Sequence, residues 1–472
     1  MTLSSLGIGL LFTVFAAIFL DSGKRNFFLF SFSILALYAL HPVLPIRFLD
    51  FWLPTAALLL AVAFWLAYTP RESLKIRENL LAAIWLFVLI LVLGLTRYLD
   101  INLFLTASTP PRVEQVLPAL LLVGLLLGAL TFFAGSKNLA WSGIILLILL
   151  LVALKLEPLT LWLAQLLRLS AAQSVETASV LDIRWLGFSY IAFRLIHTLY
   201  DGIKGRAIQV SLSEYITFVF FYPTLIAGPI DRIERFVKDL RASFVRADVD
   251  WDFVLKRLTL GLFKKFILAD SLALIALSPQ NAPQLQSPGW AWVLLYAYAL
   301  QIFIDFSGYT DLSLALARLV GINLPENFNA PYLKPNLTQF WNNWHMSLTQ
   351  WFRSYVFNPF SRSLRSTSLP AWSMILMAQL LTMALIGLWH GITLNFFFWG
   401  LWHALGLFIH NRWQDLFRTQ VTSWANTPIR QQAATWGGIL LTFHFVVLGW
   451  VWFALPTPES AVNFFALLFS LR

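Results

Sequence analysis

Long runs of apolar residues without a charge recur along the whole sequence and constrain its fold more than any other feature. A helix needs roughly 20 apolar residues to cross a bilayer core about 30 Å thick. Runs such as 115–134 and 371–388 approach that length. Only 12% of the residues are charged and 59% are hydrophobic, whereas soluble domains carry about 25% charged residues. Because backbone polar groups in lipid must bond within their own element, the sequence predicts an all-α, polytopic membrane protein.

The lengths of these runs predict roughly 11–13 full crossings, with re-entrant or tilted helices where a run is too short to cross alone. Residues 159–172 are predicted to form a short or interfacial helix. Gly308 is predicted to break the chain after the run 290–306. Charges within 253–277 allow only part of that run to enter lipid. The complete set of predicted runs is 1–20, 27–46, 51–69, 80–96, 115–134, 139–156, 185–199, 212–228, 253–277, 290–306, 310–322, 371–388, 392–410, 435–455 and 461–471.

The sequence predicts one membrane domain without internal repeats. Its first 20 residues lack a basic leading region and a small-residue cleavage pattern, so they are predicted to remain as a first span. The early loops 21–26 and 70–79 are basic, and basic loops favour the cytoplasm, so the N-terminus is predicted to lie outside. The expected parts are N-terminal peripheral helices over 1–180, a catalytic core over 181–410 and C-terminal helices over 411–472.

The net charge of +10 first suggests a nucleic-acid partner, but the basic residues are dispersed between apolar runs. The preference of basic residues for cytoplasmic loops explains them without nucleic acid. The sequence has no cysteine, which excludes disulfides, a thiol nucleophile and thiolate metal sites. It also lacks a Walker A loop, a G-x-G-x-x-G fingerprint, an H-E-x-x-H pair and a G-x-S-x-G elbow. We therefore expect no bound cofactor and no metal, and neither a nucleotide-driven pump nor a zinc peptidase.

Three of the seven histidines directly follow a tryptophan, namely His345, His390 and His403. Aromatic residues at three- and four-residue steps predict a helix over 339–357, with His345 at the edge of its aromatic face and close to a polar face. His390 follows the run 371–388 and lies between two glycines, where a helix is weakest. The simplest alternative is a hydrogen-bonded histidine at the lipid–water boundary. Because a titratable ring near membrane depth is costly, His345 and His390 are predicted to be functional, and His403 to be structural.

Other polar residues also interrupt apolar runs. Asp305 is predicted to face protein and to have a cationic or hydrogen-bonding partner. Two prolines and a glycine within 221–232 predict a sharp backbone break. His41, His410 and His444 are predicted to be structural. A polar seam, either functional or structural, is predicted on one helix face from Tyr190, Arg194, His197 and Asp201.

Four segments together resemble the membrane-bound O-acyltransferase (MBOAT) family, in the bacterial branch that contains alginate O-acetyltransferase and the D-alanyl transferase of teichoic acids. They are GFSYIAFRLIHTLYD, FFYPTLIAGPIDR, IDFSGYTDLS, and FNAPYLKPNLTQFWNNWHMSLTQWFRSYVFNPF with LIGLWHG. The resemblance implies helices ringed around a thinned centre in the bacterial cytoplasmic (inner) membrane. It also implies His390 as the principal catalytic histidine and His345 as the second. Ser354 stands where the family often has an acidic residue, and Ser-Arg-Ser-Leu at 361–364 replaces the Gly-Gly-Asn-Arg of the alginate branch. These departures weigh against an alginate-type acceptor.

Acyl transfer to a hydroxyl needs a base and oxyanion donors, and a neutral histidine suits the role of base near pH 7. The resemblance implies a cytoplasmic thioester donor of a small acyl group such as acetyl, either acyl-CoA or acyl-carrier protein. It further implies a hydroxyl acceptor on a polysaccharide, wall polymer or lipid, an extracytoplasmic acyl-relay protein, and contact with membrane lipid. Substrate-binding or supporting positions are expected at Asn343, Trp344, Trp389 and Asp305. A transporter or channel for a glycan or lipid, and a structural scaffold, are the alternatives.

Overall fold

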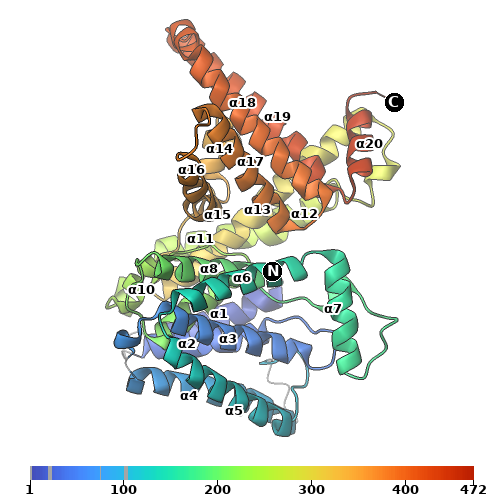
Figure 1. The fold of residues 1–472 in the computed structure, drawn as a ribbon. Helices are drawn as coiled ribbons and strands as arrows, with labels where there is room; N and C mark the ends of the chain where they lie inside the picture. The colour runs from blue at the N-terminus through green and yellow to red at the C-terminus, as the bar shows by residue number, and fades with distance from the viewer. Residues whose placement is uncertain (1–2, 20–23, 75, 100–104, 472) are drawn as a thin grey trace. The chain divides into compact units, whose positions relative to one another are not determined.

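The computed structural model describes residues 3–19, 24–74, 76–99 and 105–471, and every regular element in these ranges is a helix (Figure 1). The packing of the helices divides the chain into two compact units. Unit 1 comprises residues 1–257 and 312–325, and unit 2 comprises residues 258–311 and 326–472. These limits differ from the predicted limits at 180 and 410, and the single membrane domain stays a prediction.

Unit 1 is built around α3 (Leu49–Tyr68), most of which is buried. Helices α2, α6, α8 and α9 pack against it, because all of them contribute apolar residues to one core. Helices α4 and α5 pack against each other and are much less buried, since only 28% and 11% of the residues in their most apolar stretches are buried. The other helices of this unit are α1 (Leu3–Ile18), α2 (Arg25–Ala39), α4 (Ile76–Leu95), α5 (Val113–Leu130), α6 (Lys137–Ala153), α7 (Glu157–Ser170), α8 (Phe188–Ile203), α9 (Leu212–Phe220) and α10 (Ile233–Arg241).

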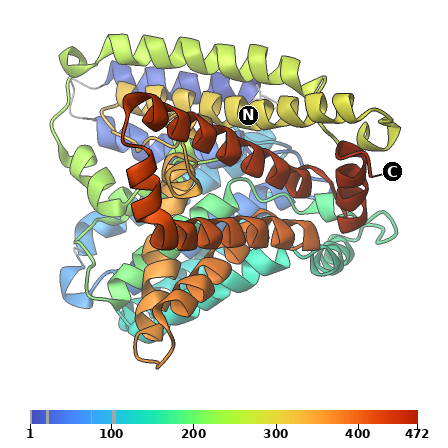
Figure 2. The same ribbon diagram turned by 90° about the horizontal axis from the view of Figure 1, so that it is seen from above.

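Unit 2 contains the hairpin of α17 (Ala371–His390) and α18 (Leu394–Trp424), and α18 also packs against α19 (Figure 2). Glycines allow the hairpin to close tightly, since a Cβ at Gly387 would lie 2.1 Å from the carbonyl oxygen of Phe396. The remaining helices are α12 (Asp270–Ala273), α14 (Leu337–Asn343), α15 (Met346–Phe352), α16 (Asn358–Leu364), α19 (Pro428–Ala454) and α20 (Pro458–Leu468). Helices α11 (Trp251–Phe263) and α13 (Pro288–Leu319) supply residues to both units.

Six helices within the described ranges are long and apolar enough to cross a membrane, or seven if the bent pair α6–α7 forms one span. This is fewer than the predicted 11–13 crossings. Several apolar runs form helices that are too short, such as α8 with 16 residues and α9 with 9. Such helices are tolerated because they are buried in protein, as the core of unit 1 shows. Helix α7 turns by 93° from α6, which agrees with the short or interfacial helix predicted over 159–172.

The prediction that Gly308 breaks the chain is wrong, because α13 runs through it without interruption. A Cβ at Gly308 would lie 2.9 Å from the Cβ of Lys264 and 3.0 Å from the backbone nitrogen of Lys265. The glycine therefore permits the close approach of a neighbouring segment, the π-helix η8 (Lys264–Ala269). By contrast, the predicted break within 221–232 is confirmed, since α9 ends at Phe220 and only a short 3₁₀ turn follows before α10.

Candidate active site

The backbone breaks at His345, so the prediction of one helix over 339–357 is wrong. Helix α14 ends at Asn343, His345 adopts the left-handed conformation with φ of 41°, and α15 begins at Met346. Two backbone hydrogen bonds to a neighbouring irregular segment replace the missing helical ones. The N–H of Met346 donates to the carbonyl oxygen of Asn327 at 2.9 Å, and the N–H of Asn329 donates to that of Asn343 at 3.1 Å.

The side chain of Asn327 fixes the same break, and sequence reasoning missed it. Asn327 is fully buried, and its carboxamide oxygen accepts hydrogen bonds from the Ser347 hydroxyl at 2.6 Å and the Ser347 N–H at 3.3 Å. The available signal was an amide directly before the conspicuous segment that starts at Phe328. Periodicity cannot reveal its role, because its partner lies 20 residues further along the chain.

His345 is almost completely buried, at 3% exposure. Its ring packs edge-on against Phe306 of α13, with 4.7 Å between ring centroids, and lies 6.5 Å from the ring of Trp389. Burial lowers the pKa of His345 to about 3, because the charged imidazolium would lose its hydration. The imidazole is therefore neutral at pH 7.

His390 is the last residue of α17, and unlike His345 it is partly exposed. The helix ends there because Gly391 continues in an extended conformation, with φ of −177°. Gly387 does not weaken α17 as predicted, since the helix continues through it. The His390 ring lies 4.6 Å from the ring of Trp389 and 4.8 Å from that of Phe453.

The two predicted catalytic histidines therefore share one neighbour, the indole of Trp389. His345 reaches it from the break between α14 and α15, and His390 from the end of α17. Trp389 lies between one buried and one partly exposed imidazole, and its supporting role stays a prediction. The catalytic roles of His345 and His390 stay predictions.

Trp344 and Asn343 hold the break in place. Trp344 is 5% exposed, and its ring packs against five aromatic neighbours, Phe303, Phe328, Tyr332, Phe340 and Trp450. The Asn343 side chain donates to the carbonyl oxygen of Gln339 in its own helix at 2.8 Å. Both residues therefore stabilise α14 and its end, and a substrate-binding role for either stays a prediction.

Asp305 has the cationic partner that was predicted, since its carboxylate forms an ion pair with Lys265. The adjacent Lys264 forms a second ion pair with Asp311 at 2.7 Å. Both pairs join the π-helix η8 to α13, where Gly308 allows close approach. Asp305 directly precedes Phe306, whose ring contacts His345, so the pairs anchor the part of α13 that touches the site.

His403, His444 and Arg194 each have well-defined surroundings within their own unit. His403 is fully buried against Trp341 and Trp399, and neither of its ring nitrogens has a hydrogen-bond partner among the described residues. His444 bonds to the hydroxyl of Tyr296 at 2.9 Å. In unit 1, Arg194 donates to the carbonyl oxygens of Val219 at 2.7 Å and Thr224 at 2.9 Å, which stabilises the break after α9.

A cavity of about 220 Å³ lies within unit 2, among α14, α15, α17, α18 and the π-helix η11 (Arg353–Phe357), and neither His345 nor His390 lines it. Its lining includes Thr349, one turn after His345, and Ile386, one turn before His390. Apolar and polar side chains both line it, including Met383, Arg353, Gln379 and Asn411. The described residues contain no group of three or more histidine or acidic side chains arranged to hold a metal. The same helices that carry the two histidines thus also enclose a small cavity of mixed polarity.

Comparison with known proteins matches residues 150–452, more than half of the chain, to the model of the MBOAT, membrane-bound O-acyltransferase family. The chain is 31% identical over 291 residues to the teichoic acid D-alanyltransferase of Streptococcus thermophilus, which covers 58% of this chain and 68% of the relative. It is 31% identical over 288 residues to a protein of Pseudomonas putida named "Probable alginate O-acetylase AlgI", covering 60% and 55%. It is 30% identical over 261 residues to the peptidoglycan O-acetyltransferase of Helicobacter pylori, covering 53% and 45%. The matched residues include both breaks that carry His345 and His390, and this chain belongs to the membrane-bound O-acyltransferase family.

Proposed function

We propose that this protein transfers a small acyl group from a thioester to a hydroxyl of a polysaccharide or wall polymer at the cytoplasmic membrane. The observation that carries the proposal is the approach of His345 and His390 to Trp389 in a chain of this family. The three relatives are named for teichoic acid, alginate and peptidoglycan, which share the acylation of a polymer.

In the proposed reaction, His390 is the general base. Its neutral imidazole takes the proton of the acceptor hydroxyl while the oxygen attacks the thioester carbonyl carbon. The tetrahedral oxyanion then collapses, the carbon–sulfur bond breaks, and the thiolate takes the proton from the imidazolium. The products are an ester and a free thiol. The partial exposure of His390 supports this role, because a base must reach its substrate.

The buried His345 suits a second role. Because its pKa is far below 7, it stays neutral and can donate one N–H to the oxyanion without bringing a charge into the site. Its rigid setting between Phe306 and Trp389 supports a fixed donor, since preorganised donors stabilise a transition state best. We assign His345 as this donor.

We further propose that the cavity of unit 2, whose walls include residues one turn from His345 and one turn from His390, accepts the acyl group. Its volume of about 220 Å³ lies below the roughly 300–1,000 Å³ of drug-sized ligand pockets. A short acyl group on the end of a thioester arm fits such a space, whereas a long fatty acyl chain does not. Arg353, Gln379 and Asn411 supply polar contacts for the arm.

The test uses purified full-length protein, an acetyl or alanyl thioester donor and a hydroxyl-bearing glycan acceptor. His390→Ala should lower turnover by about 10²–10⁴-fold, the usual loss of a general base. His345→Asn should retain more activity than His345→Ala, because an amide keeps a donor. His403→Phe is the matched control and should turn over normally. Wild-type turnover by His390→Ala would refute the proposed base, and glycan or lipid transport into proteoliposomes without donor consumption would support a transporter instead.

A further inference from the structure

Unit 1 carries an apolar groove between α3, α4 and α5, with a volume of about 760 Å³. Leu80, Phe87 and Leu91 line it from α4, and Leu121 and Gly128 line it from α5. Both helices are candidate membrane spans, and Leu80 and Leu121 are 55% and 61% exposed. The groove is therefore open on a surface that faces lipid. Helices α4 and α5 precede residue 150, so the family match does not include these two walls of the groove.

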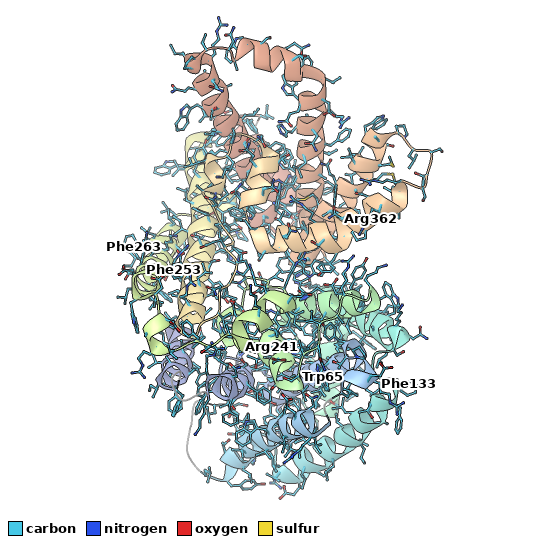
Figure 3. The ribbon with its side chains drawn as sticks, turned by 90° about the vertical axis from the view of Figure 1, so that its left-hand side faces the viewer. Trp65, Phe133, Arg241, Phe253, Phe263 and Arg362 are labelled. Carbon is cyan, nitrogen blue, oxygen red and sulfur yellow. The ribbon has the colours of Figure 1, made fainter. Side chains whose placement is uncertain are left out.

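One end of the groove is polar. A second pocket of about 240 Å³ is lined by Glu78, Glu214, Arg241 and the polar loop before α9. Asn79 lines both the groove and this pocket, so the two adjoin at this residue. Asn79 is held in place because its side-chain oxygen accepts the N–H of Leu212 at 2.8 Å. Figure 3 labels Trp65 of the groove and Arg241 of the polar pocket, both in unit 1. Such a site matches a ligand with an apolar chain and a polar head.

The charges of the polar pocket define that head. Arg241 binds Glu214 in a bidentate ion pair, at 2.7 Å through Nε and 2.8 Å through Nη2, which leaves Nη1 without a hydrogen bond to any described residue. Glu78 is exposed, and among the described residues its only recorded interaction is its electrostatic attraction to Arg241. A free carboxylate beside a partly free guanidinium complements a head with one ammonium and one phosphate group.

The length of the groove matches one leaflet of a bilayer. At about 1.5 Å per helical residue, its α4 lining from Asn79 to Leu91 extends for about 18 Å, slightly more than half of a hydrocarbon core of about 30 Å. Asn79 lies in the first turns of α4, where the span begins, so the polar pocket lies at the membrane interface. An acyl chain that enters at Asn79 can therefore follow the groove to the bilayer midplane.

We propose that unit 1 binds one zwitterionic phospholipid of the ethanolamine class. Its acyl chain occupies the groove, its ammonium group binds Glu78, and its phosphate binds the free edge of Arg241. This lipid site is separate from the proposed acyl transfer and does not involve His345 or His390.

The experiment measures lipid adducts of the delipidated full chain by native mass spectrometry, with ethanolamine, choline and glycerol phospholipids of identical acyl chains. The ethanolamine lipid should bind at least about tenfold more tightly than the choline lipid, because a quaternary ammonium cannot donate a hydrogen bond to Glu78. Glu78→Gln should remove that preference while binding of the choline lipid remains. Because Glu78 is exposed, this variant is expected to fold.

A second variant tests the groove. A Cβ at Gly128 meets no atom within 4 Å, so Gly128→Phe places a ring in the groove without a backbone clash and should abolish binding of all three lipids. Gly437→Phe is the matched control, because this helical glycine of α19 also has open space around its Cβ. His390→Ala should bind lipid like the wild type even if acyl transfer is lost, which separates the two proposals.

Three results would overturn the inference. Preferential binding of the anionic glycerol lipid would show that Arg241 alone recognises the head. Equal binding of the ethanolamine and choline lipids by the wild type would remove the role of Glu78. Absence of any adduct, with an oligomer that Gly128→Phe dissociates, would show that a protein helix occupies the groove.

Discussion

Replacing Asn327 with alanine tests whether the break at His345 is held by a residue distant in sequence. The Asn327 side chain accepts two hydrogen bonds from Ser347 in a fully buried position. Each such bond contributes about 1 kcal/mol net, so Asn327→Ala should lower the free energy of unfolding by about 2 kcal/mol. The left-handed backbone of His345 costs a further 1–3 kcal/mol or so and persists only while its surroundings hold it. Losing both bonds should therefore release the break before the whole unit unfolds.

The activity should change more than the stability. A displacement of about 1 Å at a catalytic group can lower turnover by about 100-fold. Asn327 binds Ser347, which lies two residues after His345. Because its loss should shift His345, we expect turnover to fall between about 10- and 100-fold. Acyl transfer and thermal unfolding of the same purified variant measure the two effects together.

Two further variants are compared with Asn327→Ala. Asn329→Ala is the matched control, because Asn329 is exposed and contributes only its backbone N–H to the break. Ser347→Ala removes one of the two bonds, and the double variant with Asn327→Ala should show a coupling energy of about 1 kcal/mol. If Asn327→Ala keeps wild-type stability and turnover, or if Asn329→Ala is equally damaging, the break is not held by this side chain.

The remaining predictions concern single side chains. His403→Phe should fold at least as stably as the wild type by thermal unfolding, because it removes two buried nitrogens that lack hydrogen-bond partners among the described residues. Asp305→Asn should lower the stability by about 1 kcal/mol, since Lys265 is 14% exposed but the Asp305 side chain is 38% exposed and partly screened by solvent, and an unchanged melting temperature would contradict this. Burial lowers the pKa of His345 to about 3, against about 6.5 in an unfolded chain. The unfolded chain alone therefore gains a proton as the pH falls, so the contribution of His345 is complete above about pH 6.5 and decreases towards pH 3. His345→Asn should show a flatter dependence of unfolding on pH across that range.

The end of α17 illustrates what could be predicted from sequence. An uncharged apolar run followed by a glycine predicts a helix that stops near that glycine, and α17 stops at His390. These signals are local, because the helix period and its terminating residue lie within one segment. The family motifs are also local, because the segments that contain His345 and His390 can be identified in the sequence without the fold.

The break at His345 illustrates what could not be predicted. The aromatic residues from Trp341 to Trp351 keep a helical period on both sides of the break, so periodicity alone continues one helix through it. The interruption depends on Asn327, which meets Ser347 only in the folded chain. The predicted break at Gly308 was wrong because the role of a glycine depends on residues that are distant in sequence. A glycine can either end a helix or let another segment approach it, and only the neighbouring Lys264 decides between these uses.

The predicted 11–13 crossings exceed the six or seven described helices that have the length and composition of a span, because apolar composition does not distinguish burial in lipid from burial in protein. Helix α3 satisfies the length for a span and yet is 72% buried by its neighbours, whereas α5 is only 11% buried. In a large membrane protein both environments select the same side chains, so short inner helices look like interrupted spans.

The different surroundings of the two histidines follow from the same kind of nonlocal packing. Each is preceded by a tryptophan, and nothing in the sequence indicates that His345 is the more buried of the two. The contact with Phe306 buries His345, and its neutral ring then suits a fixed donor. His390 ends its helix at a hairpin turn and keeps part of its surface accessible, as a base that meets a substrate requires. A variant that exposes His345 should therefore not restore turnover to His390→Ala, because the base must stand at the end of α17, and an accessible imidazole elsewhere does not replace it.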